Sequence, residues 1–181
     1  MWKKISNDYI KPVKGMKILD IGCGTSGILP FLHSHEVQYF GYDFNKNYIE
    51  NSKKRWSSLG EYRFFHQSVD EVDCSENNTF DIVILLNLFH HLTDNETKEI
   101  INKCGTLLKQ GGSLISCDPC RFEKMSWFEK FMVKYDRGKN IKSKEEYKHL
   151  FNDKFKLKEE VVTYLANIPQ RGVLFHYEKI A

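Results

Sequence analysis

The sequence of 181 residues has no long hydrophobic run and no large net charge. Its longest strongly apolar run, Ile82 to Leu86, is far too short to span a bilayer. Residues 1–8 contain no apolar stretch of the length that a secretory signal needs. The net charge of +3 is too small to indicate a nucleic-acid partner. We therefore expect neither a transmembrane segment nor binding to nucleic acid.

Cysteines are also few, and they do not form the framework of pairs found in small secreted domains. They are Cys23, Cys74, Cys104, Cys117 and Cys120. An odd count without a secretion signal indicates reduced thiols, so we expect a cytoplasmic protein. Cys117 and Cys120 form one C-x-x-C pair, but the sequence offers no matching pair of Cys or His ligands for zinc. The C-x-x-C pair follows a strand instead of opening a thioredoxin-like helix. We therefore expect neither a metal site nor a redox site.

What the sequence does contain suits one globular domain over residues 1–181. Hydrophobic residues make up 41% and charged residues 28% of the chain, as in ordinary soluble proteins. We find no internal repeat, low-complexity tract or linker that would divide the chain.

The glycine motif of residues 18–27 is the most informative feature. Gly22, Gly24 and Gly27 stand in the spacing G-x-G-x-x-G, after an apolar run that contains Asp20. The motif predicts a strand, a sharp turn and a helix, with backbone exposed at the turn to a nucleotide-like ligand. A dinucleotide would bring an anionic pyrophosphate, which Asp20 would oppose. S-adenosylmethionine (SAM) carries a sulfonium and an ammonium instead, and a carboxylate suits it.

Further segments follow in a fixed order. The run Tyr39 to Tyr42 precedes Asp43, an acid at a strand end where a ribose diol needs an acceptor. Residues 80–92 and 107–114 add two more apolar runs, each with a recognisable turn. Together these segments, over about residues 15–120, resemble the class I SAM-dependent methyltransferases, and most closely those that act on small molecules.

Strands alternating with helices predict a Rossmann-like, doubly wound α/β fold. Thr93 with Glu96, and Ser143 with Glu146, form capping boxes that mark helix starts. Gly111-Gly112 is expected to end the third helix. We expect strands near 16–22, 38–43, 62–68, 80–87 and 112–118, helices near 26–35, 46–58 and 94–109, and a loop or one turn over 69–79. Two late runs, 155–165 and 173–180, look like the family's antiparallel pair and would complete a mostly parallel seven-stranded sheet.

The resemblance implies that the cofactor lies at the ends of the first strands. The turn at Gly22 to Gly24 would lie against the methionine part of SAM, and Asp43 would hold both ribose hydroxyls. Ser68 and Val69 stand where family members often have an acid and a small apolar residue beside the adenine. This departure leaves open whether Ser68 or Asp70 meets the adenine. The expected cofactor-binding residues are Asp20, Gly22, Cys23, Gly24, Gly27, Asp43, Ser68, Val69 and Asn87.

The run Asn87 to His91 follows the fourth strand and should border the pocket. It contains no proline, so it does not resemble the Asx-Pro-Pro-aromatic motif of enzymes that methylate exocyclic or amide nitrogens. Either His90 or His91 is a candidate general base near neutral pH, although an imidazole here can also pack structurally. Asp118 should sit at a strand end facing the pocket. The expected catalytic residues are His90, His91 and Asp118.

Residues of about 120–152 carry no comparable motif, and we expect them to form a cap on the acceptor side. Apolar side chains at near-helical spacing would suit such a cover, or would pack on the sheet; they are Phe122, Met125, Phe128, Phe131, Met132 and Tyr135. A basic cluster is typical of a solvated loop, but it could also attract an anionic substrate or membrane surface; it consists of Lys134, Arg137, Lys139, Lys142 and Lys144.

The expected function is transfer of the methyl group of SAM to a small-molecule or a lipid- or glycan-like acceptor. A base is needed only where the acceptor must lose a proton, because the sulfonium is already a good leaving group. One alternative is a SAM-binding module without activity that acts through a partner protein. A less favoured alternative is an NAD(P)-dependent reductase, which Asp20 and the antiparallel close of the sheet oppose. The acceptor and the oligomeric state are not predicted.

Overall fold

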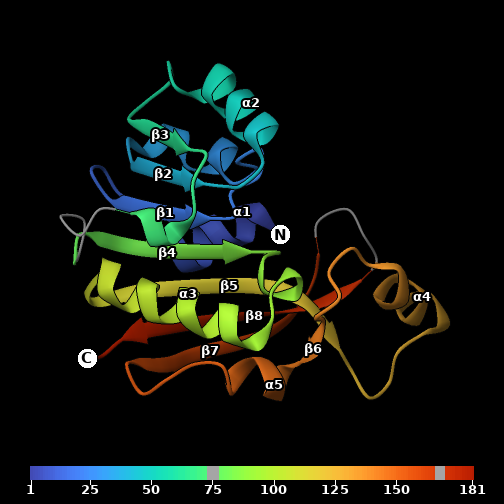
Figure 1. The fold of residues 1–181 in the computed structure, drawn as a ribbon. Helices are drawn as coiled ribbons and strands as arrows, with labels where there is room; N and C mark the ends of the chain where they lie inside the picture. The colour runs from blue at the N-terminus through green and yellow to red at the C-terminus, as the bar shows by residue number, and fades with distance from the viewer. Residues whose placement is uncertain (73–77, 166–169) are drawn as a thin grey trace.

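A computed structural model describes residues 1–72, 78–165 and 170–181, and it contains one mixed β-sheet with helices on its faces (Figure 1). The strand order is β3-β2-β1-β4-β5-β8-β7, and a two-residue strand, β6, pairs with β5. The strands from β3 to β5 are parallel, whereas β8 and β7 run antiparallel. The predicted Rossmann-like fold is confirmed, with β6 as an eighth strand. The strands are β1 Lys17–Ile21, β2 Gln38–Tyr42, β3 Tyr62–Phe65, β4 Phe80–Leu86, β5 Leu108–Arg121, β6 Lys142–Ser143, β7 Phe155–Tyr164 and β8 Arg171–Lys179.

Polar caps fix the starts of the main helices. The capping boxes predicted at Thr93 and Ser143 are both formed, and each helix begins at the next residue. A third box, Ser126 with Glu129, starts α4 and was not predicted. The helices are α1 Trp2–Lys4, η1 Ile5–Ile10, η2 Leu29–Phe31, η3 His33–His35, α2 Lys46–Trp56, η4 Val69–Glu71, η6 Phe89–His91, α3 Asp94–Leu107, α4 Trp127–Tyr135 and α5 Lys144–Lys148.

Two hydrophobic cores lie on the two faces of the sheet. The alternation of β1 divides its side chains between them: Leu19 and Ile21 pack with α3, whereas Ile18 packs with η1 and α2. This arrangement leaves the carboxyl ends of β1, β2 and β4 together at one edge, where open α/β sheets bind ligands. In the described part of the chain, no helix is long and apolar enough to cross a membrane.

Two local predictions are wrong. Residues 26–35 form two short 3₁₀ turns instead of a helix: Ser26 has a left-handed φ of 56°, and Pro30 cannot donate a backbone hydrogen bond. The Gly111-Gly112 pair does not end α3, which ends at Leu107. The pair lies inside β5, at a register shift against β4, where Gly111 has a φ of 73°. These glycines therefore form a strand irregularity.

Other predictions are confirmed in part. Residues 69–71 form the turn η4, while 73–77 lie outside the described residues. The helical spacing over 122–135 gives a helix only from Trp127 onward. Four cysteines are free and buried, including both members of the C-x-x-C pair, and Cys74 lies outside the described residues. The N-terminal turns α1 and η1 were not predicted.

Candidate active site

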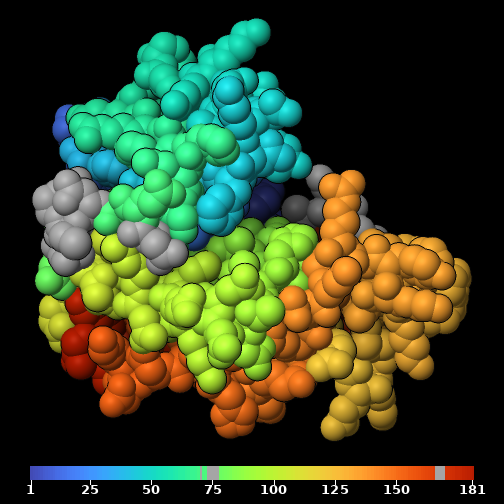
Figure 2. All heavy atoms as spheres, viewed as in Figure 1, coloured from blue at the N-terminus to red at the C-terminus, as the bar shows by residue number. Residues whose placement is uncertain are grey.

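A cavity of 610 Å³ opens at the carboxyl ends of β1, β2 and β4. Figure 2 shows it as a hollow between the cyan surface near α2 and the green surface near η6, with the dark blue N-terminal residues at its floor. The cavity brings together most of the predicted cofactor residues, which come from segments far apart in sequence. It is lined by Trp2, Ile21, Gly22, Cys23, Gly24, Thr25, Gly27, Tyr42, Asp43, Phe44, Tyr48, Gln67, Ser68, Val69, Leu86, Asn87, Leu88, His91, Leu92 and Ile100.

The glycine turn is tied to the end of β2. The backbone N–H groups of Gly22 and Cys23 both donate to the carbonyl of Tyr42, at 2.8 and 3.1 Å. Gly22 and Gly24 have φ values of 71° and 53°, which glycine adopts without strain. A Cβ added at Gly24 would meet no atom within 4 Å, so this stretch of backbone faces open space. The turn thus presents main chain to the cavity, as the sequence predicted.

Asp43 is held at the cavity by two backbone donors. Its Oδ2 accepts from the N–H of Gly24 at 2.8 Å, and its Oδ1 accepts from Asn45 at 2.7 Å. Asn45 in turn caps α2 through its side chain. Each carboxylate oxygen has a further lone pair for a ligand hydroxyl, because an ionised carboxylate has about four acceptor sites.

Asp20 lies behind the turn and does not line the cavity. Its side chain is buried, and the hydroxyl of Tyr39 donates to Oδ2 at 2.5 Å. Burial raises the pKa of Asp20 to about 7; the Tyr39 hydrogen bond opposes the rise and nearby Asp43 adds to it. Burial also raises the pKa of the Cys23 thiol. Asp20 therefore links β1 to the neighbouring strand β2 through Tyr39, and its preference for a cationic ligand stays a prediction.

The expected adenine and strand-end residues all border the cavity. Val69 is buried there, and the backbone N–H of Ser68 donates to Glu71 at 2.9 Å. Asn87 has a left-handed φ of 57°, and its N–H donates to the carbonyl of Cys117 at 2.8 Å. The side chain of Asp70 lies outside the described residues, so the choice between Ser68 and Asp70 stays open.

The three predicted catalytic residues are not equivalent. His91 lines the cavity, whereas His90 and Asp118 are buried outside its lining. The two imidazole rings lie 4.0 Å apart, centroid to centroid. Burial and the neighbouring His90 lower the pKa of His91 below its usual value. A neutral imidazole at pH 7 can accept a proton, and His91 is the member of the trio that lines the cavity; its role as a base stays a prediction.

His90 is fixed by aspartates on two sides. Asp118 Oδ1 lies 2.7 Å from His90 Nδ1 and accepts from its backbone N–H at 3.1 Å, while Asp136 Oδ1 lies 3.6 Å from Nε2. The backbone of Asn140 donates to the carbonyl of His90 at 3.0 Å. A Cβ at Gly138 would approach His90 Cδ2 to 2.1 Å. The segment 136–140 therefore packs closely on His90, next to the cavity residue His91.

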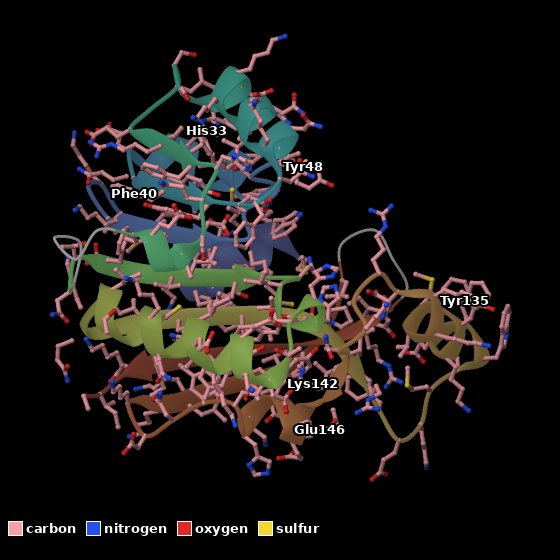
Figure 3. The ribbon with its side chains drawn as sticks, in the orientation of Figure 1. His33, Phe40, Tyr48, Tyr135, Lys142 and Glu146 are labelled. Atoms are coloured by element: carbon pink, nitrogen blue, oxygen red, sulfur yellow. The ribbon has the colours of Figure 1, made fainter. Side chains whose placement is uncertain are left out.

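Sequence reasoning missed several aromatic residues of the cavity. Phe44 follows Asp43 directly and is 76% exposed, and Tyr48 stands in the first turn of α2 (Figure 3). Trp2 packs against Gly27, whose added Cβ would lie 3.5 Å from the indole. The aromatic residue directly after the strand-end acid was a usable signal for Phe44. Nothing local indicated Trp2, because it reaches the cavity from the N-terminal turn.

The residues of the basic cluster predicted between Lys134 and Lys144 do not form one exposed loop. Lys142 is buried, with its Nζ 3.2 Å from both Asp94 and the carbonyl of Asn140, so it is not part of a solvated loop. Lys144 pairs with Glu160 at 2.8 Å. Among the described residues, no group of three or more His, Cys, Asp or Glu side chains is arranged to hold a metal ion.

Comparison with known proteins identifies the class. A family model described as a methyltransferase domain matches residues 18–112, which is more than half of the chain, and the chain belongs to this family. Solved neighbours include a SAM-dependent methyltransferase and a methyltransferase in complex with SAM, and with the family match the resemblance inferred from the motifs is confirmed. This family assignment speaks against the alternative of an NAD(P)-dependent reductase.

Two sequence relatives act on different small molecules, according to their names. A phosphoethanolamine N-methyltransferase of Plasmodium falciparum is 28% identical over 130 residues, covering 71% of this chain and 48% of the relative. A ubiquinone biosynthesis O-methyltransferase of Coxiella burnetii is 28% identical over 103 residues, covering 56% of this chain and 43% of the relative. The chain thus spans about half the length of the curated relatives it matches.

Solved structures share the fold at low sequence identity. A SAM-dependent methyltransferase from Methanosarcina mazei superposes with a TM-score of 0.77 at 18% identity, covering 92% of this chain and 93% of the other. A geranyl diphosphate methyltransferase in complex with SAM gives 0.77 at 16% identity, covering 98% and 84%. These likenesses support the architecture and leave the acceptor undetermined.

Proposed function

We propose that this protein transfers the methyl group of SAM to a small-molecule acceptor bound beside His91. The observation that carries the proposal is the cavity at the glycine turn, which joins open backbone at Gly24 to the anchored carboxylate of Asp43. Membership of the methyltransferase domain family supports the reaction type. The N- and O-methyltransferases among the relatives support a small acceptor.

The cavity fits SAM in size and chemistry. Its 610 Å³ lies within the range of cofactor sites, about 300–1,000 Å³. Asp43 would accept from the ribose hydroxyls, and Ser68 with Val69 would border the adenine. Phe44 and Trp2 would cover apolar surface and exclude water. When bound, SAM supplies a methyl group on a sulfonium that needs no further activation.

His91 would act as the general base toward the acceptor. Its lowered pKa keeps the imidazole neutral at pH 7, so a ring nitrogen can take the proton that an acceptor hydroxyl or amine releases. The buried pair of His90 and Asp118 would act indirectly, by fixing the backbone that carries His91. The cap predicted over 120–152 stays a prediction. No described residue of that range lines the cavity, although 136–140 packs on His90.

The decisive experiment combines binding with transfer. Isothermal titration should show binding of SAM and S-adenosylhomocysteine and none of NAD. Incubation with methyl-labelled SAM and fractionated metabolite extracts should then label one fraction. SAM binding without transfer to any fraction would instead favour the non-catalytic module, and binding of NAD without SAM would overturn the proposal.

A further inference from the structure

Helix α4 presents a stripe of aromatic side chains to solvent. Trp127, Phe131 and Tyr135 are spaced four residues apart and are 78%, 50% and 64% exposed. This spacing aligns them on one side of a helix. The opposite side carries Glu129, which is buried, and Val133, which is partly buried. The stripe is therefore a surface feature and is not needed to pack the helix on the domain.

Exposed cations flank the stripe, whereas the carboxylates of α4 and of the residue after it are paired or turned inward; Glu123, before the helix, is the exposed carboxylate of this region. Glu129 is buried and pairs with Arg171, which holds the pKa of Glu129 near 2. Asp136 is mostly buried and faces His90. The exposed cations of this region are Lys124, Lys130, Lys134, Arg137 and Lys139. The outer face of α4 is thus aromatic and positively charged.

The stripe points away from the domain. In Figure 1, α4 projects beyond the end of the sheet, and Figure 3 shows Tyr135 on its outer side. Lys134 Nζ lies 5.4 Å from the Tyr135 ring centroid, so the charge and the aromatic surface are adjacent. Tryptophan and tyrosine flanked by lysine favour the interface of a bilayer, because the rings enter the headgroup region while the ammonium groups meet anionic lipid.

We propose that α4 is a peripheral docking helix for a membrane surface rich in anionic phospholipid. The aromatic stripe would enter the headgroup layer, and the surrounding lysines would contact lipid phosphates. A flat anionic surface fits this face better than a protein partner does, because nine residues of one convex helix offer charge and aromatic area but no groove. The proposal is independent of methyl transfer.

The test is flotation of the full chain with vesicles, without SAM or acceptor. The protein should float with vesicles of phosphatidylcholine mixed with phosphatidylglycerol, and not with phosphatidylcholine alone. Binding should weaken as salt rises. Trp127 should shift its fluorescence to the blue on binding. Trp127→Phe should remove that shift and keep most of the flotation, because the aromatic surface is retained.

Surface variants distinguish vesicle binding through the aromatic stripe from non-specific adsorption of the protein. Phe131→Ser should lower vesicle affinity at least several-fold, and Lys130→Gln with Lys134→Gln should lower it by about fivefold per lysine at low salt. Leu59→Ser, and Lys53→Gln with Lys54→Gln, remove comparable exposed groups from another part of the surface and should change little. All these positions are exposed, and thermal melting would confirm that each variant folds.

Three outcomes would overturn the proposal. The first is no flotation with anionic vesicles at low salt, or equal losses in the control variants. The second is a dimer that Phe131→Ser dissociates, which would assign the stripe to a second copy of the chain. The third is a Trp127 shift produced by SAM without lipid, which would assign α4 to a cap over the cavity. Because flotation needs no cofactor, the first two results leave the SAM-binding test unaffected, and the third would itself require that SAM binds.

Discussion

The carboxylate of Asp43 accepts a hydrogen bond from the backbone N–H of Gly24, with 2.8 Å between Oδ2 and N. This bond joins the end of β2 to the turn after β1, two segments that are adjacent only in the folded sheet. The same hydrogen bond both orients the carboxylate toward the cavity and supports the exposed turn. Changes at Asp43 should therefore weaken cofactor binding in two ways, by removing a ligand acceptor and by releasing the Gly24 turn.

Asp43→Ala should lower the affinity for SAM by about 10- to 100-fold. Removing an acceptor that pairs ligand hydroxyls costs about 1–3 kcal/mol, because the donors are left unsatisfied. Titration calorimetry at pH 7 measures the change, and a melting curve checks that the variant is folded. Glu50→Ala, an exposed carboxylate on α2, serves as the matched control. An unchanged dissociation constant would remove Asp43 from the site.

His91→Gln should lower turnover by about 10²- to 10⁴-fold if the acceptor must lose a proton, with SAM affinity little changed. His149→Gln alters an exposed histidine outside the cavity and should leave turnover intact. Because the pKa of His91 is lowered, its neutral form predominates at pH 7. Wild-type turnover should therefore hold at pH 7 and fall only in more acid solution. A pH profile shared by wild type and His91→Gln would contradict this role.

Asp20 should make the folded state less stable as the pH rises. Its pKa is about 7 in the folded protein against an ordinary value of 3.8, so the folded state binds the proton more tightly than the unfolded state does. Its contribution to stability is fully present below the unfolded pKa and is lost as the pH rises through the folded pKa.

Asp20→Asn retains an acceptor for the Tyr39 hydroxyl but cannot ionise. The free energy of unfolding of the wild type, relative to that of this variant, should therefore decrease as the pH rises from the unfolded-state pKa of Asp20 to its folded-state pKa of about 7. Urea unfolding of both proteins across that interval measures the difference. A difference that stays constant with pH would show that Asp20 does not titrate in the buried site.

Gly138→Ala should destabilise the protein, whereas Gly105→Ala should stabilise it. A Cβ at Gly138 would lie 2.1 Å from His90 Cδ2 and 2.5 Å from the His90 carbonyl oxygen, so segment 136–140 would have to move. Overpacking of this kind costs about 1–3 kcal/mol or more. At Gly105, inside α3, the nearest atoms lie at an ordinary 3.6 Å, and alanine gains about 0.5–1 kcal/mol in a helix interior. Melting temperatures that move in the same direction would refute this comparison.

Local patterns in the sequence were reliable wherever neighbouring residues decide the structure. The boxes at Thr93 and Ser143 start α3 and α5 because a side chain caps the backbone only three residues away. The Ser126 box carries the same signal and would have placed the start of α4. The Gly111-Gly112 pair led to the wrong prediction of a helix end, because glycine permits a left-handed φ equally at a helix end and within a strand.

The sequence by itself determined the alternating fold, the glycine turn and the acid that follows β2, because these depend on periodicity and on the conformational freedom of glycine. Only the tertiary structure decided which polar side chains reach the cavity. It buried Asp20 against Tyr39 and held His90 between Asp118 and Asp136, leaving His91 at the cavity. Adjacent residues such as His90 and His91 look alike in sequence. Their environments differ because burial and charge come from strands and loops that are distant along the chain.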